Sequence, residues 1–67
     1  MTQETIAANI RRIIQQKGLI QRAAAERAGF TKQRFADMLG GRKVIRAEYV
    51  PDIASALGVE ISDLFSE

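Results

Sequence analysis

Three polar side chains, Lys32, Gln33 and Asp37, fall on what would be the outward face of one short helical segment. The amide of Gln33 can both donate to and accept from the edge of an adenine, and the ammonium of Lys32 can donate to the acceptors of a guanine. The carboxylate of Asp37 can only accept, which suits the amino group of a cytosine. These residue types indicate recognition by hydrogen bonding, with an exposed polar helix face as the alternative for each.

The composition gives no support for catalysis. The 67 residues include no His and no Cys, which removes the commonest general base, the commonest metal ligand and any disulfide or thiolate metal site. The sequence has no glycine-rich phosphate loop, and a core this small leaves no room for a sizeable pocket. We therefore expect no enzymatic activity, no metal, no cofactor and no small-molecule substrate.

Two short helices joined by a tight turn would position these side chains. The segment over residues 21–40 reads QRAAAERAGFTKQRFADMLG. Ala25 is small where the two helices would cross, Gly29 stands where the turn needs a positive φ, and Thr31 can cap the second helix. This pattern is typical of a helix-turn-helix, whose second helix usually enters the major groove of DNA.

Apolar spacing, glycine stops and the single proline predict three more helices. In the first of them, isoleucines at i, i+4, i+7 and i+8 form one apolar stripe, and Gly18 ends the helix. Pro51 is tolerated in a first helical turn but not in a helix interior, so its helix cannot begin much earlier. We expect an all-α bundle of five helices forming one domain over residues 1–67, with the second and third helices crossing steeply. The expected helices are 5–17, 21–28, 32–39, 49–57 and 61–65.

Side chains outside this periodicity also have expected positions. We expect Phe30 to be buried and to anchor the turn between the second and third helices. We expect Val44, in the loop over residues 42–48, to pack into the core. The polar residues of the first helix are expected to fall largely outside its apolar stripe; they are Asn9, Arg11, Arg12, Gln15 and Gln16.

Charge is distributed unevenly along the chain. All ten Lys and Arg residues lie within residues 11–46, the basic block, where only Glu26 and Asp37 oppose them, so the block carries +8 whereas the whole chain carries +2. Such a field attracts a polyanion, and the alternative is an ordinary solvated surface. The residues before the block carry −1, and the tail carries −5 from Glu48, Asp52, Glu60, Asp63 and Glu67.

A membrane partner is not indicated. The chain has no apolar run of about 18 residues and no signal-peptide layout, so we expect a cytoplasmic protein. A basic helix lying on a membrane surface is suggested by Arg11, Arg12 and Lys17. This alternative is disfavoured because the apolar face of the helix over residues 5–17 is needed for the core.

The chain resembles the phage repressor and Cro (Xre-type) family of helix-turn-helix regulators over nearly its whole length. GLIQRAAAERAGFTKQRFADMLGGRK is similar to that family's second and third helices with their flanks, and IASALGVEISDLF is similar to its fourth and fifth. Pro51, just before the second of these segments, is most similar to the lambdoid repressor branch. The resemblance implies a five-helix, lambda-repressor-like DNA-binding fold.

The resemblance also implies roles for particular residues. Lys32, Gln33 and Asp37 match positions that reach base edges. Gln21 matches a position that contacts a phosphate and braces the recognition helix, and Arg34 and Arg42 match positions near the DNA backbone. The complete set expected at the backbone is Gln21, Thr31, Arg34, Arg42 and Lys43.

One departure from the family concerns the core. Many members place a buried Arg in the first helix against a Glu at the end of the third, where this chain has Ile14 and Leu39. An apolar pair avoids the desolvation cost of a buried ion pair. Because the ion pair normally helps to hold a backbone-contacting region, this departure bears on the phosphate contacts near Arg42.

The resulting hypothesis is a sequence-specific DNA-binding transcription regulator, a repressor that binds a palindromic operator in double-stranded DNA as a homodimer. The alternative is an antitoxin or another protein-binding module with the same fold, since a fold does not determine a function. Apolar residues late in the chain could form the dimer interface or could simply close the core of the monomer. These residues are Val59, Ile61, Leu64 and Phe65.

Overall fold

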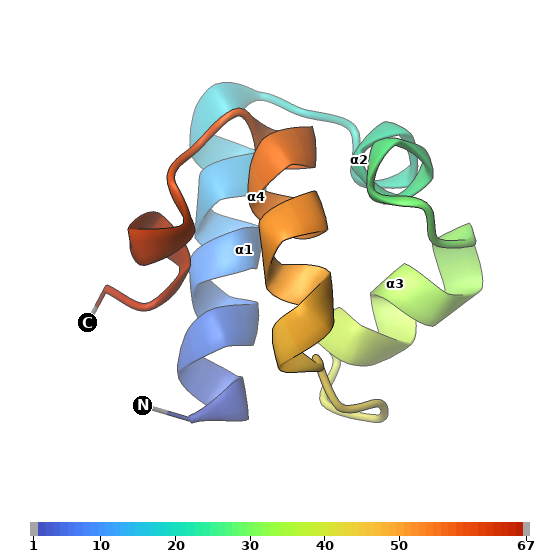
Figure 1. Ribbon diagram of the computed structural model, residues 1–67. Helices are drawn as coiled ribbons and strands as arrows, with labels where there is room; N and C mark the ends of the chain where they lie inside the picture. The colour runs from blue at the N-terminus through green and yellow to red at the C-terminus, as the bar shows by residue number, and fades with distance from the viewer. Residues whose placement is uncertain (1, 67) are drawn as a thin grey trace.

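Four α-helices and two short 3₁₀-helices make up the chain in a computed structural model that describes residues 2–66, and no strand occurs in that range (Figure 1). Glu67, the last residue of the acidic tail, lies outside the described residues. The helices are α1 (Gln3–Lys17), α2 (Gln21–Ala28), α3 (Lys32–Leu39), η1 (Ala47–Tyr49), α4 (Val50–Leu57) and η2 (Ile61–Leu64).

The all-helical prediction is confirmed, whereas the count of five helices is wrong. The segment expected as a fifth helix is the 3₁₀-helix η2, whose backbone bonds run from Asp63 to Glu60 and from Phe65 to Ser62. A segment of three or four residues completes few α-helical hydrogen bonds. Runs of this length are usual for a 3₁₀-helix.

The first and fourth helices begin close to their expected residues. The hydroxyl of Thr2 accepts a hydrogen bond from the Thr5 amide at 3.1 Å, and this cap starts α1 two residues earlier than expected. At the other end of α1, Gly18 adopts a φ of 68° and closes the helix. Pro51 lies in the first turn of α4, as predicted, and η1 precedes it.

The helix-turn-helix is built as its sequence predicts. Gly29 has a φ of 90°, and the amide of Phe30 donates to the Ala25 carbonyl at 2.8 Å, which closes the turn after α2. The Thr31 hydroxyl accepts from the Arg34 amide at 3.1 Å and caps α3. Ala25 is fully buried, which allows the helices to approach closely, whereas Phe30 is only half-buried.

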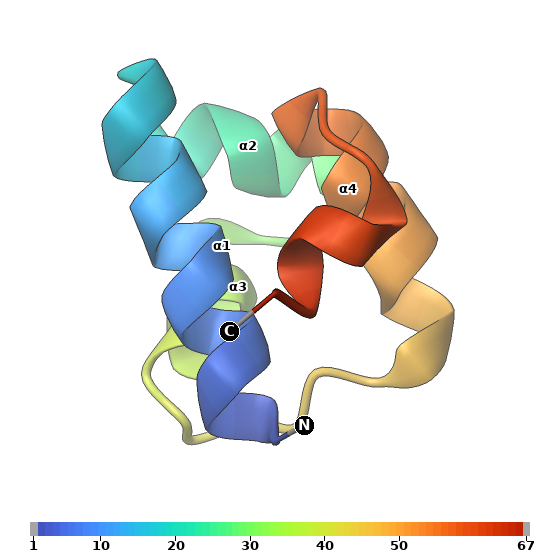
Figure 2. The same cartoon turned by 90° about the vertical axis from the view of Figure 1, so that its left-hand side faces the viewer.

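The core lies where these helices meet. α2 packs on α4 and on α3, while α1 packs on α3 and on η2. Figure 2 shows η2 between α1 and α4, and it contacts both. The largest side chains that are fully buried are Phe35, Ile10, Met38, Ile53 and Leu64.

The prediction for Val44 is wrong. Its side chain is 66% exposed, and the neighbouring Ile45 is buried instead. The side-chain amide of Gln3 donates to the Ile45 carbonyl at 2.9 Å and accepts from the Ile45 amide at 2.6 Å. This clamp holds the backbone at Ile45, whose side chain faces the core, while the Val44 side chain faces solvent.

Asn9 is the exception among the polar residues expected largely outside the apolar stripe of α1, because its side chain is buried. Its amide nitrogen donates to the carbonyls of Leu64, at 2.8 Å, and Ser66, at 2.6 Å. The carbonyl of the same side chain accepts from Arg12 at 2.9 Å. Carbonyls at the end of a helical segment lack donors from the helix itself. Asn9 donates to two of them from α1 and so anchors the C-terminal segment.

Candidate nucleic-acid interface

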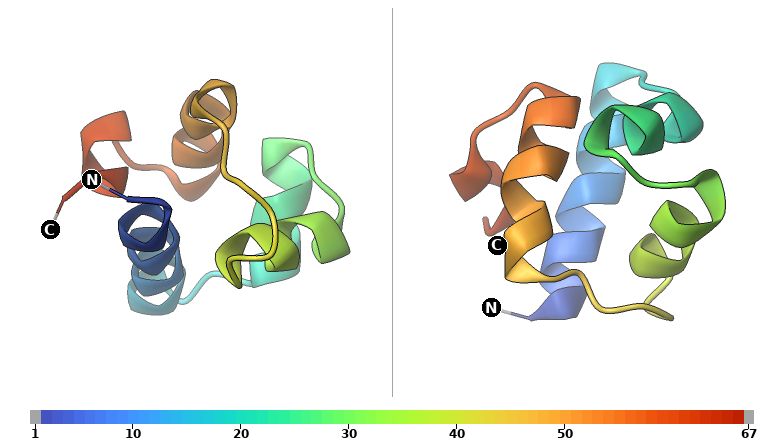
Figure 3. Two further views of the ribbon diagram at one scale, coloured as in Figure 1. Left: turned by 90° about the horizontal axis from the view of Figure 1, so that it is seen from below. Right: turned by 45° about the vertical axis from the view of Figure 1, so that its right-hand side comes forward.

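The outward face of α3 carries Lys32 and Gln33 near its beginning, and both side chains are exposed. Gln21 is exposed at the beginning of α2, which has no side-chain N-cap. Asp37, one turn further along α3 than Gln33, is half-buried. Figure 3 shows α3 at the edge of the molecule, where its outer face is not covered by another helix.

The structure brings three of the expected site residues together. One carboxylate oxygen of Asp37, Oδ1, accepts from Nε of Arg42 at 2.9 Å and from Nε2 of Gln33 at 3.0 Å. The backbone carbonyl of Asp37 also accepts from the amides of Arg42, at 2.8 Å, and Lys43, at 3.2 Å. The side chains of Gln33, Asp37 and Arg42 therefore form one connected group on the exposed face of α3, the Asp37 network.

The ionisation of Asp37 follows from these contacts. The hydrogen bond from Arg42 is the main cause that lowers the pKa of the Asp37 carboxyl below its ordinary value. Desolvation opposes this shift, and the hydrogen bond from Gln33 and the charges of Arg42 and Lys43 reinforce it. These contacts favour the ionised form of the carboxyl, which lies beside the Arg42 cation.

Arg34 lies against aromatic rings beside the turn. Its guanidinium is 5.7 Å from the centre of the Phe30 ring and 5.6 Å from that of Tyr49, and it donates to the Tyr49 hydroxyl at 2.9 Å. The Phe30 and Tyr49 rings meet edge to face at 5.0 Å. Arg34 thus connects α3 to η1 while its side chain stays exposed.

A basic groove lies beside this aromatic contact. It has a volume of about 220 Å³ and is lined partly by Arg34, Lys43, Arg46 and Tyr49. Neither Arg46 nor Tyr49 is among the site residues predicted from the sequence. The position of Arg46 in the basic block is the only signal for it, and nothing in the sequence indicates Tyr49.

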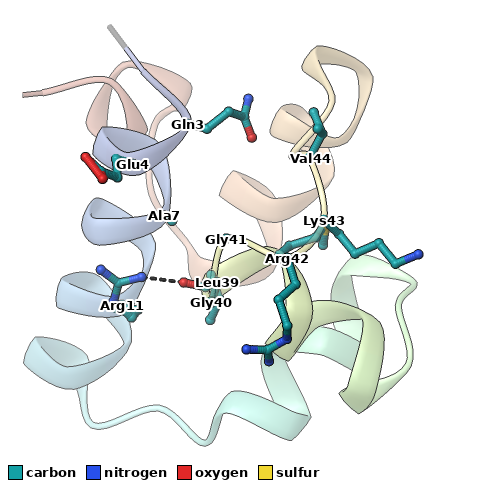
Figure 4. Close-up of a pocket in the computed structure, with 11 residues that line it drawn as sticks. Gln3, Glu4, Ala7, Arg11, Leu39, Gly40, Gly41, Arg42, Lys43 and Val44 are labelled. Atoms are coloured by element: carbon teal, nitrogen blue, oxygen red, sulfur yellow. Dashed lines mark hydrogen bonds between the residues drawn. The ribbon is translucent and has the colours of Figure 1, made fainter.

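A second groove, of about 440 Å³, lies between α1 and the loop that follows α3 (Figure 4). Figure 4 shows the Arg11 side chain reaching across it, where its guanidinium donates to the Leu39 carbonyl. Ile14 and Leu39 are both buried in the common core. Arg11 makes a polar link between α1 and the end of α3. In the family that the chain resembles, a buried ion pair commonly joins these two places.

The residues expected at a dimer interface differ in their exposure. Leu64 is fully buried in the core of the monomer, so its side chain has no surface for a partner, and the expected interface is reduced to the other three residues. Ile61 is 45% exposed, and Val59 and Phe65 are half-buried against the core. In Figures 1 and 3 this segment lies at the opposite side of the molecule from α3.

Within residues 2–66, no helix has the length and apolar character that crossing a bilayer requires.

Comparison with known proteins supports this architecture. A family model described as a helix-turn-helix domain matches residues 5–64. The chain is also similar to two crystal structures of the clp gene regulator ClgR from Corynebacterium glutamicum, with 25% sequence identity to each and TM-scores of 0.87 and 0.86. Each match covers 94% of this chain, with 82% of the first structure's chain and 67% of the second's. No curated protein sequence matches the chain.

Proposed function

The chain belongs to the family of helix-turn-helix domains, and from this premise we propose that it is a sequence-specific DNA-binding transcription regulator whose α3 enters the major groove. One observation carries the proposal. α3 is fixed from behind by Phe35 and Met38, which are buried, while Lys32 and Gln33 project from its other face. A helix that is held rigidly and presents polar side chains outward is what direct readout in a groove requires.

Base contacts in this proposal come from α3. Gln33 reads an adenine through its amide, and Lys32 donates to a guanine. Asp37 lies on the same helix one turn after Gln33. Its carboxylate enters the groove already paired with Arg42, which offsets the repulsion from phosphates.

Backbone contacts come from the residues around α3. Gln21 and Thr31 lie at the beginnings of α2 and α3, where helical amides favour an anion. Arg34, Arg42 and Lys43 supply positive charge on the side of α3 and in the loop after it. If a dimer made roughly 6–10 phosphate contacts, its affinity would fall on the order of 10³–10⁵-fold between 50 and 200 mM salt.

The active form in this proposal is a homodimer, because one short recognition helix reads too few base pairs for a specific site. Dimerisation through Val59, Ile61 and Phe65 leaves both α3 helices free, since the tail lies across the molecule from them. Two-fold symmetry then demands a palindromic operator with half-sites roughly 34 Å apart. The likeness to phage repressors and Cro supports repression, rather than activation, as the outcome of binding.

The two similar crystal structures support the regulatory role, since each is described as a gene regulator. Selection of binding sites from random duplex DNA by the purified chain, followed by footprinting on the best site, tests the proposal. We expect a palindromic site with two protected half-sites about one helical turn apart. Failure to enrich any sequence would contradict sequence-specific binding, and enrichment only with a second protein present would favour the protein-binding alternative. A single unsymmetrical footprint would exclude the dimer.

A further inference from the structure

The Asp37 network joins side chains from α3 and from the loop after it. We propose that Asp37 is a positioning residue, which fixes the amide of Gln33 and the guanidinium of Arg42 and so sets the preference at the base pair that Gln33 reads. This inference rests on the proposed function, because it concerns how the same surface reads DNA. It assigns to Asp37 a role through its neighbours in place of a base contact of its own.

The Gln33 amide has one orientation in this network. Its Nε2 donates one of its two hydrogens to Oδ1 of Asp37 at 3.0 Å. The opposite orientation would turn the amide oxygen toward the carboxylate and set two acceptors against each other. The second N–H and the amide oxygen remain for a base, and a bidentate contact with adenine uses one donor and one acceptor of this kind. Asp37 therefore prepares Gln33 for adenine before DNA arrives.

Arg42 is held by the same carboxylate oxygen. Its Nε lies 2.9 Å from Oδ1, so the terminal nitrogens of the guanidinium are available to a phosphate. The guanidinium also lies against Gly40, where a Cβ atom would be only 2.9 Å from Nη1 and 3.2 Å from Cζ. Gly40 has a φ of −89°, which any residue adopts, so room for Arg42 is the structural reason for a glycine at this position.

The carboxylate thus links a base-facing side chain to a backbone-facing one. Both donors share Oδ1, and the backbone carbonyl of Asp37 binds the Arg42 amide as well. A phosphate that fixes Arg42 would also fix Asp37 and, through it, Gln33. Preorganisation of this kind raises discrimination because less side-chain freedom is lost on binding.

A titration without DNA tests the network itself. The Asp37 carboxyl and the side-chain amide of Gln33 are followed by NMR as the pH is lowered. We expect the pKa of Asp37 to lie below the ordinary carboxylate range and the Gln33 amide resonance to shift over the same pH interval. Arg42→Ala and Gly40→Ala should each raise the pKa, the second by displacing the guanidinium. An ordinary pKa for Asp37 in the unmodified protein would overturn the inference.

Binding measurements test the effect on DNA. Affinity is measured for two duplexes, the best selected site and the same site with one base pair changed. The changed pair is the one at which Gln33→Ala relaxes the preference. Asp37→Ala should lower discrimination at that same pair about five-fold or more, which is the lower end of what a bidentate base contact contributes. The double variant Gln33→Ala/Asp37→Ala should discriminate no worse than Gln33→Ala alone. Asp37→Asn, which keeps an acceptor for Gln33, should retain most of the preference.

Glu26→Ala is the matched control, because it removes one exposed carboxylate from the basic block without touching the network. It should change affinity for both sites equally. If Asp37→Ala changes the preference at a different base pair, Asp37 reads a base itself and the inference is wrong. The inference is also wrong if the unmodified protein discriminates between the two sites and Asp37→Ala leaves that discrimination unchanged. A protein that prefers no sequence at all would instead refute the proposed function, and with it this inference, whatever the titration shows.

Discussion

Several charged residues of the basic block hold the fold together, and they are therefore less available to a polyanion than the charge count suggests. Arg11 donates to the Leu39 carbonyl, Arg12 to the side chain of Asn9, and Lys17 to the Gly58 carbonyl. All three belong to α1. The positive surface that remains for DNA is consequently concentrated on α2, on α3 and in the loop after α3, which is the side that carries Gln33.

Gln33 and Arg42 should respond differently to truncation. Gln33→Ala should cost about 1–3 kcal/mol on the best site and relax the preference at one base pair, because a base contact is lost. Arg42→Ala should weaken binding to all sequences, because a phosphate contact is lost, and should relax the preference at the Gln33 pair less than Gln33→Ala does, because Arg42 acts on Gln33 only through Asp37. Equilibrium binding to the best site and to a scrambled duplex measures both effects. Equal losses on the two duplexes for Gln33→Ala would mean that Gln33 does not read a base.

The stability of the protein should depend on pH through Asp37. Its pKa is lowered in the folded state, so the contribution of the carboxylate to stability is present above its ordinary pKa and is lost as the pH falls through the lower folded value. Urea unfolding of the unmodified protein and of Asp37→Asn should differ at neutral pH, and the difference should shrink once the pH falls below about 4. Glu26→Gln serves as the control. A difference that stays constant down to strongly acidic pH would contradict the paired carboxylate.

Residue types alone predicted which side chains of α3 face outward, but not the Asp37 network. Lys32 and Gln33 are exposed as expected, because the apolar positions of α3 determine which face is buried. The contact between Asp37 and Arg42 depends on a loop that reverses direction at Gly40 and Gly41. Local sequence patterns indicate that a helix ends there, but not where the next side chain lies.

At the scale of elements, the sequence predicted the helix-turn-helix best. Both α2 and α3 have the expected bounds, since glycines and a threonine cap determine their ends. The errors fall where distant groups decide the outcome. Gln3 reaches across 42 positions of sequence to turn Ile45 inward, and Asn9 reaches across 55 to the Leu64 carbonyl. Periodicity within one helix contains no information about such partners.

The turn between α2 and α3 should tolerate only glycine well. Gly29→Ala places a Cβ on a residue whose φ is 90°, and it should cost about 1 kcal/mol in the free energy of unfolding. Gly40→Ala is the comparison, because Gly40 has a negative φ, so any cost there comes from displacing the exposed Arg42 side chain and not from the backbone. Urea denaturation compares the two. Equal costs for the two variants would show that the backbone conformation of the turn is not what requires Gly29.

Asn9 should stabilise the C-terminal segment. Asn9→Ala removes the donor from two carbonyls and should cost about 1–3 kcal/mol, because at least one of these carbonyls is buried with it. The amides of η2 should also exchange faster with solvent than those of α2 and α3. Gln16→Ala, an exposed change on the same helix, should leave both readouts unchanged. Unaltered exchange of η2 in Asn9→Ala would mean that other contacts anchor the tail.

The molecule as a whole separates opposite charges. The basic residues expected at DNA lie on and around α3, whereas Glu60 and Asp63 lie in and beside η2 on the other side (Figure 1). A field of this kind orients the protein as it approaches a duplex and keeps the tail away from phosphates.

The proposed position of α3 in the major groove is tested most directly by its distance from a spin label placed there. A nitroxide attached to a thymine of the selected half-site, projecting into the major groove, broadens the NMR signals of nearby amides. We predict the strongest broadening for residues 32–37 and the weakest for residues 59–65, even if dimerisation shifts the latter resonances. Broadening that is strongest in α1 or in the tail, or that is uniform over the chain, would contradict the claim.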